Sequence, residues 1–268
     1  LARFGGEAED LSLAVVTADH RVDPPERFTA AVDAALAAAE AAPVLATIGI
    51  VPTRPETGFG YIEVGGPGAG AAADVPVARP VVRFVEKPDR DTATRLVASG
   101  RYLWNSGMFF FRLRTFLEQL QLTRPDMSRI VRDLAPLVAA GATPAAAELF
   151  ATLEDVSIDY ALMEKAPRVG VVPGQFGWED VGSFEALARC LGTDAQGNSV
   201  AGEAVVLDSR DCVVINDPGA ARMAVGVVGL EGVAVIVTED AVLVAPKGCG
   251  QQVRQVVAEL RRRGAPQI

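Results

Sequence analysis

Hydrophobic and polar positions along the first part of the chain follow the order expected for strands that alternate with helices. Apolar runs at Leu11–His20 and Pro43–Pro52 predict buried strands, and Pro24–Ala42 between them predicts a helix with proline in its first turn. Such a β–α–β unit predicts parallel strands joined by a right-handed crossover. Helices are also predicted at Phe111–Leu122, Pro125–Ala140, Pro144–Leu153, Ile158–Lys165 and Ser183–Leu191, and a further strand at Arg168–Phe176.

The pattern changes after Gly192. Short valine-rich runs recur at intervals punctuated by turn residues between Asp194 and Lys247, which is typical of a small all-β domain, and Gly250–Arg263 predicts a basic helix after it. No period is regular enough to predict a repeat by inspection. We therefore predict two domains, residues 1–192 and 193–268. Within the first, the low-complexity stretch Gly65–Pro76 predicts an exposed hairpin loop.

Polar groups interrupt the hydrophobic pattern at two places between Val81 and Phe111. A strand-like run, VVRFVEKP, ends in Glu86 and Lys87, and after a polar helix a second apolar run starts around Asn105. Strand ends are where an α/β sheet presents side chains to a ligand. A carboxylate, an ammonium and an amide at such ends would fit a small molecule that is both hydroxylated and anionic.

Lysine is rare in this chain, at positions 87, 165 and 247 only, whereas arginine is abundant. Its presence at position 87 indicates a need for a compact point charge, which suits a single phosphate oxygen better than a planar guanidinium does. An exposed lysine before a turn-forming proline, with Glu86 as a solvated neighbour, explains the same residues equally well. The residues alone leave both interpretations open.

Composition narrows the class of protein. The chain has 268 residues, half of them hydrophobic, which is enough for a large core in one or two domains. A net charge of −9 without a basic run argues against nucleic acid or an anionic membrane as a partner, and a phosphate-binding enzyme of this charge would need metal cations. The three cysteines form no CxxC motif, and no signal peptide or membrane-length apolar run is present, so we predict reduced thiols, no zinc site and a cytoplasmic location.

Four motifs in order, FVEKP, WNSGMF, SIDYALMEK and WEDVGS, resemble those of the mannose-1-phosphate guanylyltransferases. The resemblance runs from about Leu11 to near the C-terminus. It implies an α/β fold with a Rossmann-like nucleotidyltransferase sheet and a small C-terminal β domain that resembles a short β-helix. The implied reaction transfers a guanylyl group from GTP to mannose 1-phosphate, giving GDP-mannose and pyrophosphate, with Mg²⁺ as cofactor.

Two aspartates are candidates for holding that ion. A sugar phosphate is already anionic near neutral pH, so catalysis requires alignment and charge neutralisation more than a general base. Asp19 lies in TADH, where the family shows a PADH-like motif from which Thr17 departs, and Asp180 lies in WEDVGS. The resemblance implies that both bind Mg²⁺. The alternative roles are a turn cap for Asp19 and a helix N-cap for Asp180, although Ser183 could cap the same helix.

The resemblance also implies the residues that bind the sugar phosphate. Glu86 would accept hydrogen bonds from sugar hydroxyls, Lys87 would bind the phosphate, Asn105 would contact a hydroxyl, Gly60 would let the backbone approach the sugar, and Asp159 would lie near the pocket. A turn glycine, a turn-forming asparagine and an acid in the first turn of a helix remain alternatives for Gly60, Asn105 and Asp159. The single histidine, His20, excludes a histidine-based triad or zinc cluster. We expect it to be structural, and the alternatives are that it orients Asp19 or contacts the nucleotide.

The family's Gly-rich nucleotide-binding loop, resembling GGxGTRLWP, does not occur in this sequence, and Gly65–Gly70 lacks its basic and threonine residues. We therefore expect a fragment that is inactive or very weak alone. A related nucleotidyltransferase with another sugar or base, and a non-catalytic regulatory homologue that binds a sugar phosphate, remain alternatives. By family analogy the C-terminal domain offers a surface for a homodimer.

Overall fold

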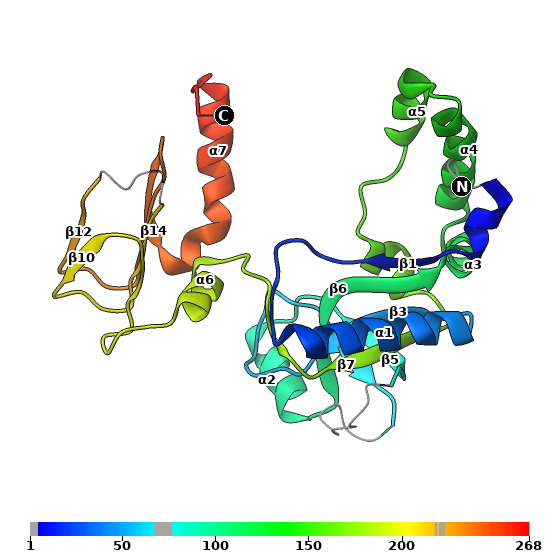
Figure 1. Cartoon of the computed structure of the whole chain (residues 1–268), viewed down its shortest axis with the longest axis horizontal. Helices are drawn as coiled ribbons and strands as arrows, with labels where there is room; N and C mark the ends of the chain where they lie inside the picture. The colour runs from blue at the N-terminus through cyan, green and yellow to red at the C-terminus, as the bar shows by residue number, and fades with distance from the viewer. Residues whose placement is uncertain (1–4, 67–76, 218, 220–222, 268) are drawn as a thin grey trace. The chain divides into compact units, whose positions relative to one another are not determined.

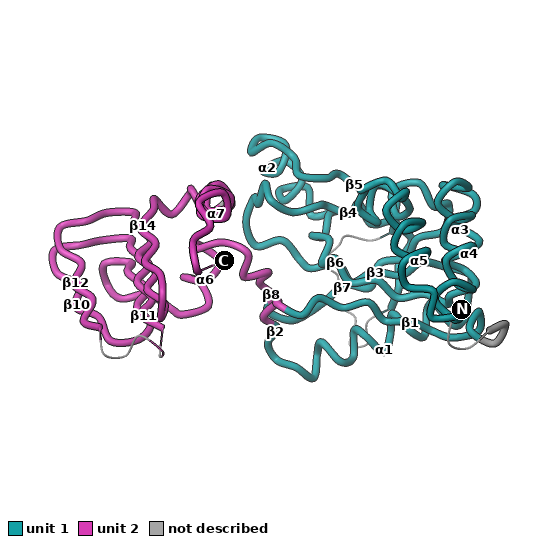
Figure 2. The backbone as a smooth tube through the Cα atoms, turned by 90° about the horizontal axis from the view of Figure 1, so that it is seen from above, with its two compact units in different colours: residues 1–18, 22–177 teal, residues 19–21, 178–268 magenta. Residues whose placement is uncertain are grey.

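The computed structural model describes residues 5–66, 77–217, 219 and 223–267. It divides into two compact units: unit 1 comprises Leu1–Ala18 and Val22–Gly177, and unit 2 comprises Asp19–Arg21 and Trp178–Ile268 (Figure 2). By this division, the segment from Trp178 to Gly192 belongs with the C-terminal β domain. The loop predicted at Gly65–Pro76 lies mostly outside the described residues.

Unit 1 is built on a six-stranded mixed sheet of order β1-β6-β3-β7-β5-β4, in which β4 also pairs with β6 (Figure 1). β3 and β7 are parallel, and β6 runs antiparallel to both β1 and β3, so β1 and β3 run in the same direction with β6 between them. The predicted α/β sheet is confirmed, with β6 inserted into the β–α–β unit. The strands are β1 (Ser12–Val15), β3 (Leu45–Ile50), β4 (Tyr61–Val64), β5 (Arg79–Val85), β6 (Tyr102–Arg112) and β7 (Val169–Gly174).

Helix α1 (Pro25–Ala41) covers the sheet through a face of alanines. Ala31, Ala35 and Ala39 are buried, and their small side chains let the helix axis approach β3, β6 and β7. The helix begins with Pro25 in its first turn, as predicted. The other helices of unit 1 are α2 (Arg90–Ala98), α3 (Leu113–Thr123), α4 (Pro125–Ala139), α5 (Thr143–Phe150), a 3₁₀ turn (Gly5–Asp10) and a π-helical turn (Asp159–Met163).

The prediction of a buried first strand is wrong. β1 pairs with β6 and with no other strand among the described residues, so it lies at the edge of the sheet. Val15 is 46% exposed and Val16 is 52% exposed. Burial of a strand depends on what lies beside it in the sheet, and a continuous apolar run does not specify that neighbour.

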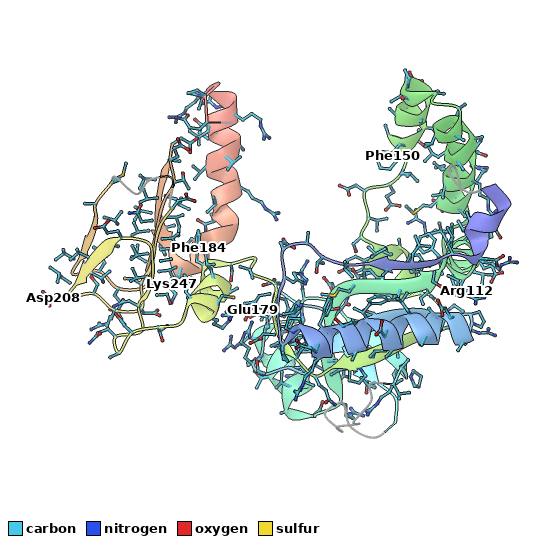
Figure 3. All side chains as sticks on the ribbon, in the orientation of Figure 1. Arg112, Phe150, Glu179, Phe184, Asp208 and Lys247 are labelled. Atoms are coloured by element: carbon cyan, nitrogen blue, oxygen red, sulfur yellow. The ribbon has the colours of Figure 1, made fainter. Side chains whose placement is uncertain are left out.

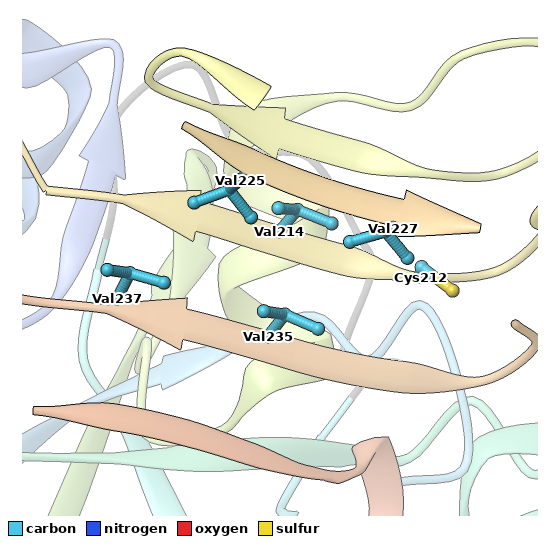
Figure 4. Packing of buried hydrophobic residues seen from close by; sticks show 6 residues of the cluster. All are labelled: Cys212, Val214, Val225, Val227, Val235 and Val237. Carbon is cyan, nitrogen blue, oxygen red and sulfur yellow. The ribbon is translucent and has the colours of Figure 1, made fainter. Parts of the chain in front are cut away.

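Unit 2 contains a short β-helix, as the family resemblance implied. Strands β9, β11 and β13 stack in parallel in one sheet, β10 and β12 stack in parallel in another, and β14 closes the first sheet antiparallel to β13. The cluster between them is formed by Cys212, Val214, Val225, Val227, Val235 and Val237 (Figure 4). The strands are β9 (Ser199–Ala201), β10 (Ala204–Leu207), β11 (Val213–Asn216), β12 (Val225–Val228), β13 (Val233–Val237) and β14 (Val242–Pro246), and the helices are α6 (Phe184–Leu191), α7 (Val253–Arg262) and a 3₁₀ turn (Lys247–Gln252).

The coils of this β-helix repeat in the sequence, although inspection of the sequence did not reveal a period. Paired residues are 21 positions apart between β10 and β12 and between β11 and β13, as for Ala204 and Val225, but 14 positions apart between β9 and β11. The turns after β10 and β12 follow the spacing of 21, since Asp208 adopts a left-handed backbone conformation with φ of 47° and Gly229 does so with φ of 67° (Asp208 is labelled in Figure 3). An aspartate in one coil thus takes the place of a glycine in the next, and together with the unequal spacing this leaves no regular period in the sequence.

Candidate functional site

A cluster in unit 1 forms around Glu86, which follows β5. Its Oε1 lies 3.3 Å from Nζ of Lys87, whose side chain is 66% exposed. A Cβ atom at Gly60 would lie 2.5 Å from Oε2 of Glu86, so the carboxylate packs directly over this glycine and would have to move for a larger residue. Lys87 has a left-handed backbone with φ of 43°, an uncommon conformation for a non-glycine residue. The glycine, the carboxylate and the ammonium therefore form one local arrangement.

Asn105 reaches this cluster from a β-bulge. The prediction that it starts a strand is wrong, because β6 begins at Tyr102. Thr47 pairs with Phe109 and Gly49 pairs with Asn105, so between the same two rungs β6 contains more residues than β3 does. Such bulges redirect side chains and are common beside active sites. The WNSGMF motif is thus an irregular strand interior and not the turn that was the alternative interpretation.

Hydrogen bonds hold Asn105 on three sides. Its backbone N–H donates to the carbonyl of Gly60 at 2.8 Å, its Nδ2 donates to Oδ1 of Asp159 at 2.8 Å, and its Oδ1 accepts from the backbone N–H of Gly107 at 3.2 Å. Gly107 takes a left-handed conformation with φ of 70°, which closes the bulge. All five residues predicted to bind a sugar phosphate therefore meet in one place, although they come from four separate segments of the chain.

Asp159 begins a turn of π-helix, a form that occurs often at functional sites. The turn closes where the backbone N–H of Glu164 donates to the carbonyl of Asp159 at 2.9 Å. Burial raises the pKa of Asp159, while the hydrogen bond from Asn105 and the charge of Lys87 oppose that rise. Burial also raises the pKa of Glu164, and the charges of Glu86 and Asp159 raise it further.

Glu164 is a member of the cluster that sequence reasoning missed. It stands five residues after Asp159, inside the SIDYALMEK motif. An α-helix places residues three and four apart on one face, so a spacing of five gives no signal for that period. In the structure Glu164 follows the π turn directly and lies within electrostatic range of Glu86 and Asp159.

Unit 2 brings together the two aspartates that were predicted to bind metal. Both Asp19 and Asp180 lie within electrostatic range of the same imidazole: burial lowers the pKa of His20, and the two carboxylates, as smaller effects, raise it. Nδ1 of His20 accepts a hydrogen bond from Nε1 of Trp178 at 3.1 Å, and the two rings meet edge to face at 5.0 Å. His20 is therefore a structural histidine placed beside the acid pair.

Asp180 lies in a strained turn. Its Oδ1 accepts from the backbone N–H of Gly182 at 3.2 Å, and Val181 between them has φ of 51°, which is a genuine outlier for a β-branched residue. The N-cap of α6 is Ser183, whose Oγ accepts from the backbone N–H of Ala186 at 3.1 Å. The alternative role of Asp180 as the cap of this helix is thus excluded.

The neighbouring Glu179, labelled in Figure 3, is fixed by a two-point ion pair. Both of its carboxylate oxygens accept from the guanidinium of Arg189 at 2.8 Å. Strand β8 (Gly177–Glu179), which carries it, pairs with β2 (Arg21–Asp23), which follows His20 in the chain. The segments that carry Asp19 and Asp180 are therefore joined by backbone pairing as well as by the His20–Trp178 contact.

Among the described residues, no group of three or more histidines, cysteines, aspartates or glutamates could hold a metal ion. A pair of carboxylates nevertheless suits Mg²⁺, which usually takes one or two protein carboxylates and completes its octahedron with phosphate oxygens and water. The donors Asp19 and Asp180 are hard oxygens, so their chemistry fits magnesium.

Two further sequence predictions can be compared with the structure. Cys190, Cys212 and Cys249 form no disulfide bond in the structure. In the part of the chain that the structure describes, every helix is too short or too polar to cross a membrane.

Comparison with known proteins identifies the family. The sequence profile of the family described as "Nucleotidyl transferase" matches residues 2–196. The chain belongs to this family. A second profile, "MannoseP isomerase/GMP-like beta-helix domain", matches residues 202–260, the region of the β-helix in unit 2. The fold class that the motifs implied is therefore confirmed in both parts.

Curated relatives within this family carry related names. The chain is 41% identical over 264 residues to the xanthan biosynthesis protein XanB of Xanthomonas campestris pv. campestris (strain B100), covering 98% of this chain and 53% of XanB. It is 38% identical over 268 residues to the mannose-1-phosphate guanylyltransferase of Escherichia coli (strain K12), covering 98% and 54%. The chain spans about half the length of the curated relatives it matches.

A solved structure shows the same architecture. It is a crystal structure described as mannose-1-phosphate geranyltransferase from Thermus thermophilus, with a TM-score of 0.78 and 38% sequence identity, and the alignment covers 96% of this chain and 73% of that one. The resemblance to mannose-1-phosphate guanylyltransferases, first drawn from four motifs, is confirmed.

Proposed function

We propose that the complete protein transfers a guanylyl group from GTP to mannose 1-phosphate, forming GDP-mannose and releasing pyrophosphate. The family membership supports nucleotidyl transfer, and the names of the relatives support this sugar and this nucleotide. The observation that carries the proposal is the cluster in unit 1. Four segments of the chain contribute to it, and together they offer the groups that a sugar phosphate requires: Gly60, Glu86 with Lys87, Asn105 and Asp159.

Each group in this cluster has a role that its chemistry suits. The exposed ammonium of Lys87 binds the sugar's phosphate, and Glu86, already placed against Gly60, accepts hydrogen bonds from sugar hydroxyls. Asn105 and Asp159 are joined at 2.8 Å and present amide and carboxylate groups side by side. The cation thus binds the phosphate end of the ligand, and the amide and carboxylate groups bind its sugar end.

In this reaction a phosphate oxygen of mannose 1-phosphate attacks the α-phosphorus of GTP, and pyrophosphate leaves with the electron pair of the broken P–O bond. The main difficulty is repulsion between two anionic reactants. Asp19 and Asp180 would hold Mg²⁺, which when bound supplies the positive charge that offsets this repulsion.

Removal of the ammonium tests the sugar-phosphate site. Lys87→Ala should raise the Kd for mannose 1-phosphate about 10- to 100-fold, because a hydrogen bond to a charged group contributes about 1.5–3 kcal/mol. Isothermal titration calorimetry on wild type and variant measures this, with glucose 1-phosphate as the comparison ligand. Arg95→Ala is the matched control: it removes one exposed positive charge from α2, where Arg95 contacts Thr92. Equal affinities for wild type and Lys87→Ala would contradict the assignment.

The acid pair has a spectroscopic test. Because the chain contains one histidine, the imidazole NMR signals report on His20 alone. Millimolar Mg²⁺ should shift these signals in the wild type, since both carboxylates act on this ring, and should leave them unchanged in Asp180→Asn. In the complete protein, Asp180→Asn should lower turnover at saturating substrates about 100-fold or more. If the chemical shifts of His20 in the wild type do not change when Mg²⁺ is added, the proposed metal site is wrong.

A further inference from the structure

Arg54 lies in the loop between β3 and β4 and stacks on two aromatic rings of unit 1. Its guanidinium carbon lies 4.9 Å from the centroid of the Trp104 ring and 6.0 Å from that of Phe59. The two rings meet edge to face with centroids 5.2 Å apart. Nε of Arg54 also lies 3.2 Å from Oε2 of Glu56. The planar cation is thus fixed between a carboxylate and an aromatic pair.

The same loop is also held by hydrogen bonds between the backbone of Glu56 and the hydroxyl of Tyr61. The Glu56 backbone N–H donates to the hydroxyl of Tyr61 at 2.9 Å, and that hydroxyl donates to the Glu56 carbonyl at 2.8 Å. Oε1 of Glu56 accepts from the backbone N–H of Thr57 at 3.1 Å. Tyr61 is completely buried. The ion pair with Glu56 therefore links Arg54 to the rigid start of β4.

The aromatic partners of Arg54 are the chain neighbours of two residues in the sugar-phosphate cluster. Phe59 precedes Gly60, and Trp104, which is 1% exposed, precedes Asn105. Gly60 and Asn105 are themselves joined by a backbone hydrogen bond at 2.8 Å. Arg54 thus spans the loop and the strand at the point where each delivers a residue to the cluster.

We propose that Arg54 is a positioning residue, which aligns Gly60 and Asn105 for the sugar by holding Phe59 and Trp104 together. This inference rests on the proposed function of the cluster. It assigns Arg54 no contact with the ligand, because its guanidinium already contacts Glu56 and the two rings. The role depends on stacking as well as charge, so a lysine should replace it in part and an alanine should not.

Two variants and a control test this role by titration calorimetry with mannose 1-phosphate. Arg54→Ala should raise the Kd about tenfold, and Arg54→Lys should recover more than half of that loss in free energy. Phe59→Leu keeps the positive charge and removes one ring, and it should weaken binding in the same direction. Arg95→Ala should bind like the wild type, which shows that the loss of one positive charge from unit 1 is not the cause.

Other results would overturn the inference. Unchanged affinity in Arg54→Ala, or normal affinity in Phe59→Leu beside a large loss in Arg54→Ala, would show that Arg54 does not act through the rings. In the complete protein the predicted change is in KM, with kcat within threefold of wild type, and a fall in kcat at constant KM would also reject it. If wild type itself fails to bind mannose 1-phosphate, the proposed function fails instead. Far-UV circular dichroism identifies any variant that does not fold. If Arg54→Ala does not fold, the affinity of Phe59→Leu tests the inference instead.

Discussion

Asp159 is a carboxylate in surroundings that disfavour its charge. Burial raises its pKa, against the smaller opposing effects of the hydrogen bond from Asn105 and the charge of Lys87. A group whose pKa is raised in the folded state stabilises the fold fully below its unfolded pKa, about 3.9 for aspartate. That stabilisation is lost as the pH rises through the folded pKa, so near neutral pH Asp159 lowers the stability of unit 1.

Asp159→Asn should therefore raise the free energy of unfolding at pH 7 and flatten its dependence on pH between 4 and 7. The variant keeps an oxygen that can accept the hydrogen bond from Asn105, so it removes the charge and little else. Urea denaturation at several pH values measures both effects. Affinity for mannose 1-phosphate should fall at the same time, the usual conflict between stability and function. A variant less stable than wild type at pH 7 would contradict this account.

The identity of several candidate site residues could be predicted from the sequence. The contacts between those residues could not. Lys87 could be singled out because lysine is so rare in this sequence, and Asp19, Glu86 and Asp180 because acids interrupt or follow apolar runs. The partnership of Asn105 with Asp159 could not be predicted, since it depends on a bulge set by the pairing of β3 with β6. Pairing between distant strands leaves no local trace in either segment.

Among the elements, the turns of the β-helix are under the tightest steric constraint. Gly202 has φ of 80°, and a Cβ atom there would lie 2.0 Å from the backbone oxygen of Asn216. Asn216 cannot yield easily, because its Nδ2 donates to the carbonyl oxygens of Glu203 at 2.9 Å and Met223 at 3.0 Å. Both the backbone conformation and the space available therefore require glycine.

Gly202→Ala should destabilise unit 2 by at least ~2 kcal/mol, because the residue would need a strained conformation and its neighbour's backbone would have to move. Gly226→Ala is the control: it lies in β12 with no atom within 4 Å of the added Cβ, and it should change stability by less than ~1 kcal/mol. Chemical denaturation followed by circular dichroism compares the two. Similar stabilities for both variants would show that the turn at Gly202 can relax.

Helix limits were well predicted wherever a cap or a proline marks them, as for α1, α4 and α6. The limits of β6 and the edge position of β1 were not, because strand length and burial are decided by neighbours elsewhere in the chain. The π turn at Asp159–Met163 was expected as an ordinary helix, since its apolar residues fit both forms.

At the scale of the whole molecule, each unit has its own hydrophobic core. In unit 1, Ile62, Leu103 and Val171 are fully buried in one cluster, and in unit 2 Cys212 and Val214 are fully buried in another. The residues of the proposed sugar-phosphate cluster all belong to unit 1: Gly60, Glu86, Lys87, Asn105 and Asp159. A substitution that lowers the stability of unit 2 should therefore leave the affinity for the sugar phosphate unchanged.

Val214→Ala should lower the stability of unit 2 by about 2 kcal/mol through the cavity it leaves, and the Kd for mannose 1-phosphate should stay the same. Differential scanning calorimetry and titration calorimetry measure the two quantities. Leu103→Ala, in the core of unit 1 next to Trp104, is the counterpart and should weaken binding. A change in affinity with Val214→Ala would show that the site depends on the β-helix.

The three-sided support of Asn105 has a thermodynamic consequence. A side chain that must be immobilised when a ligand arrives loses rotational entropy, roughly 0.5–1.5 kcal/mol for a flexible one. The Asn105 side chain is already held by Gly107 and Asp159, and its backbone by Gly60, so this loss occurs when the chain folds. In the proposed function, the amide would therefore meet a sugar hydroxyl without any further ordering of its own side chain.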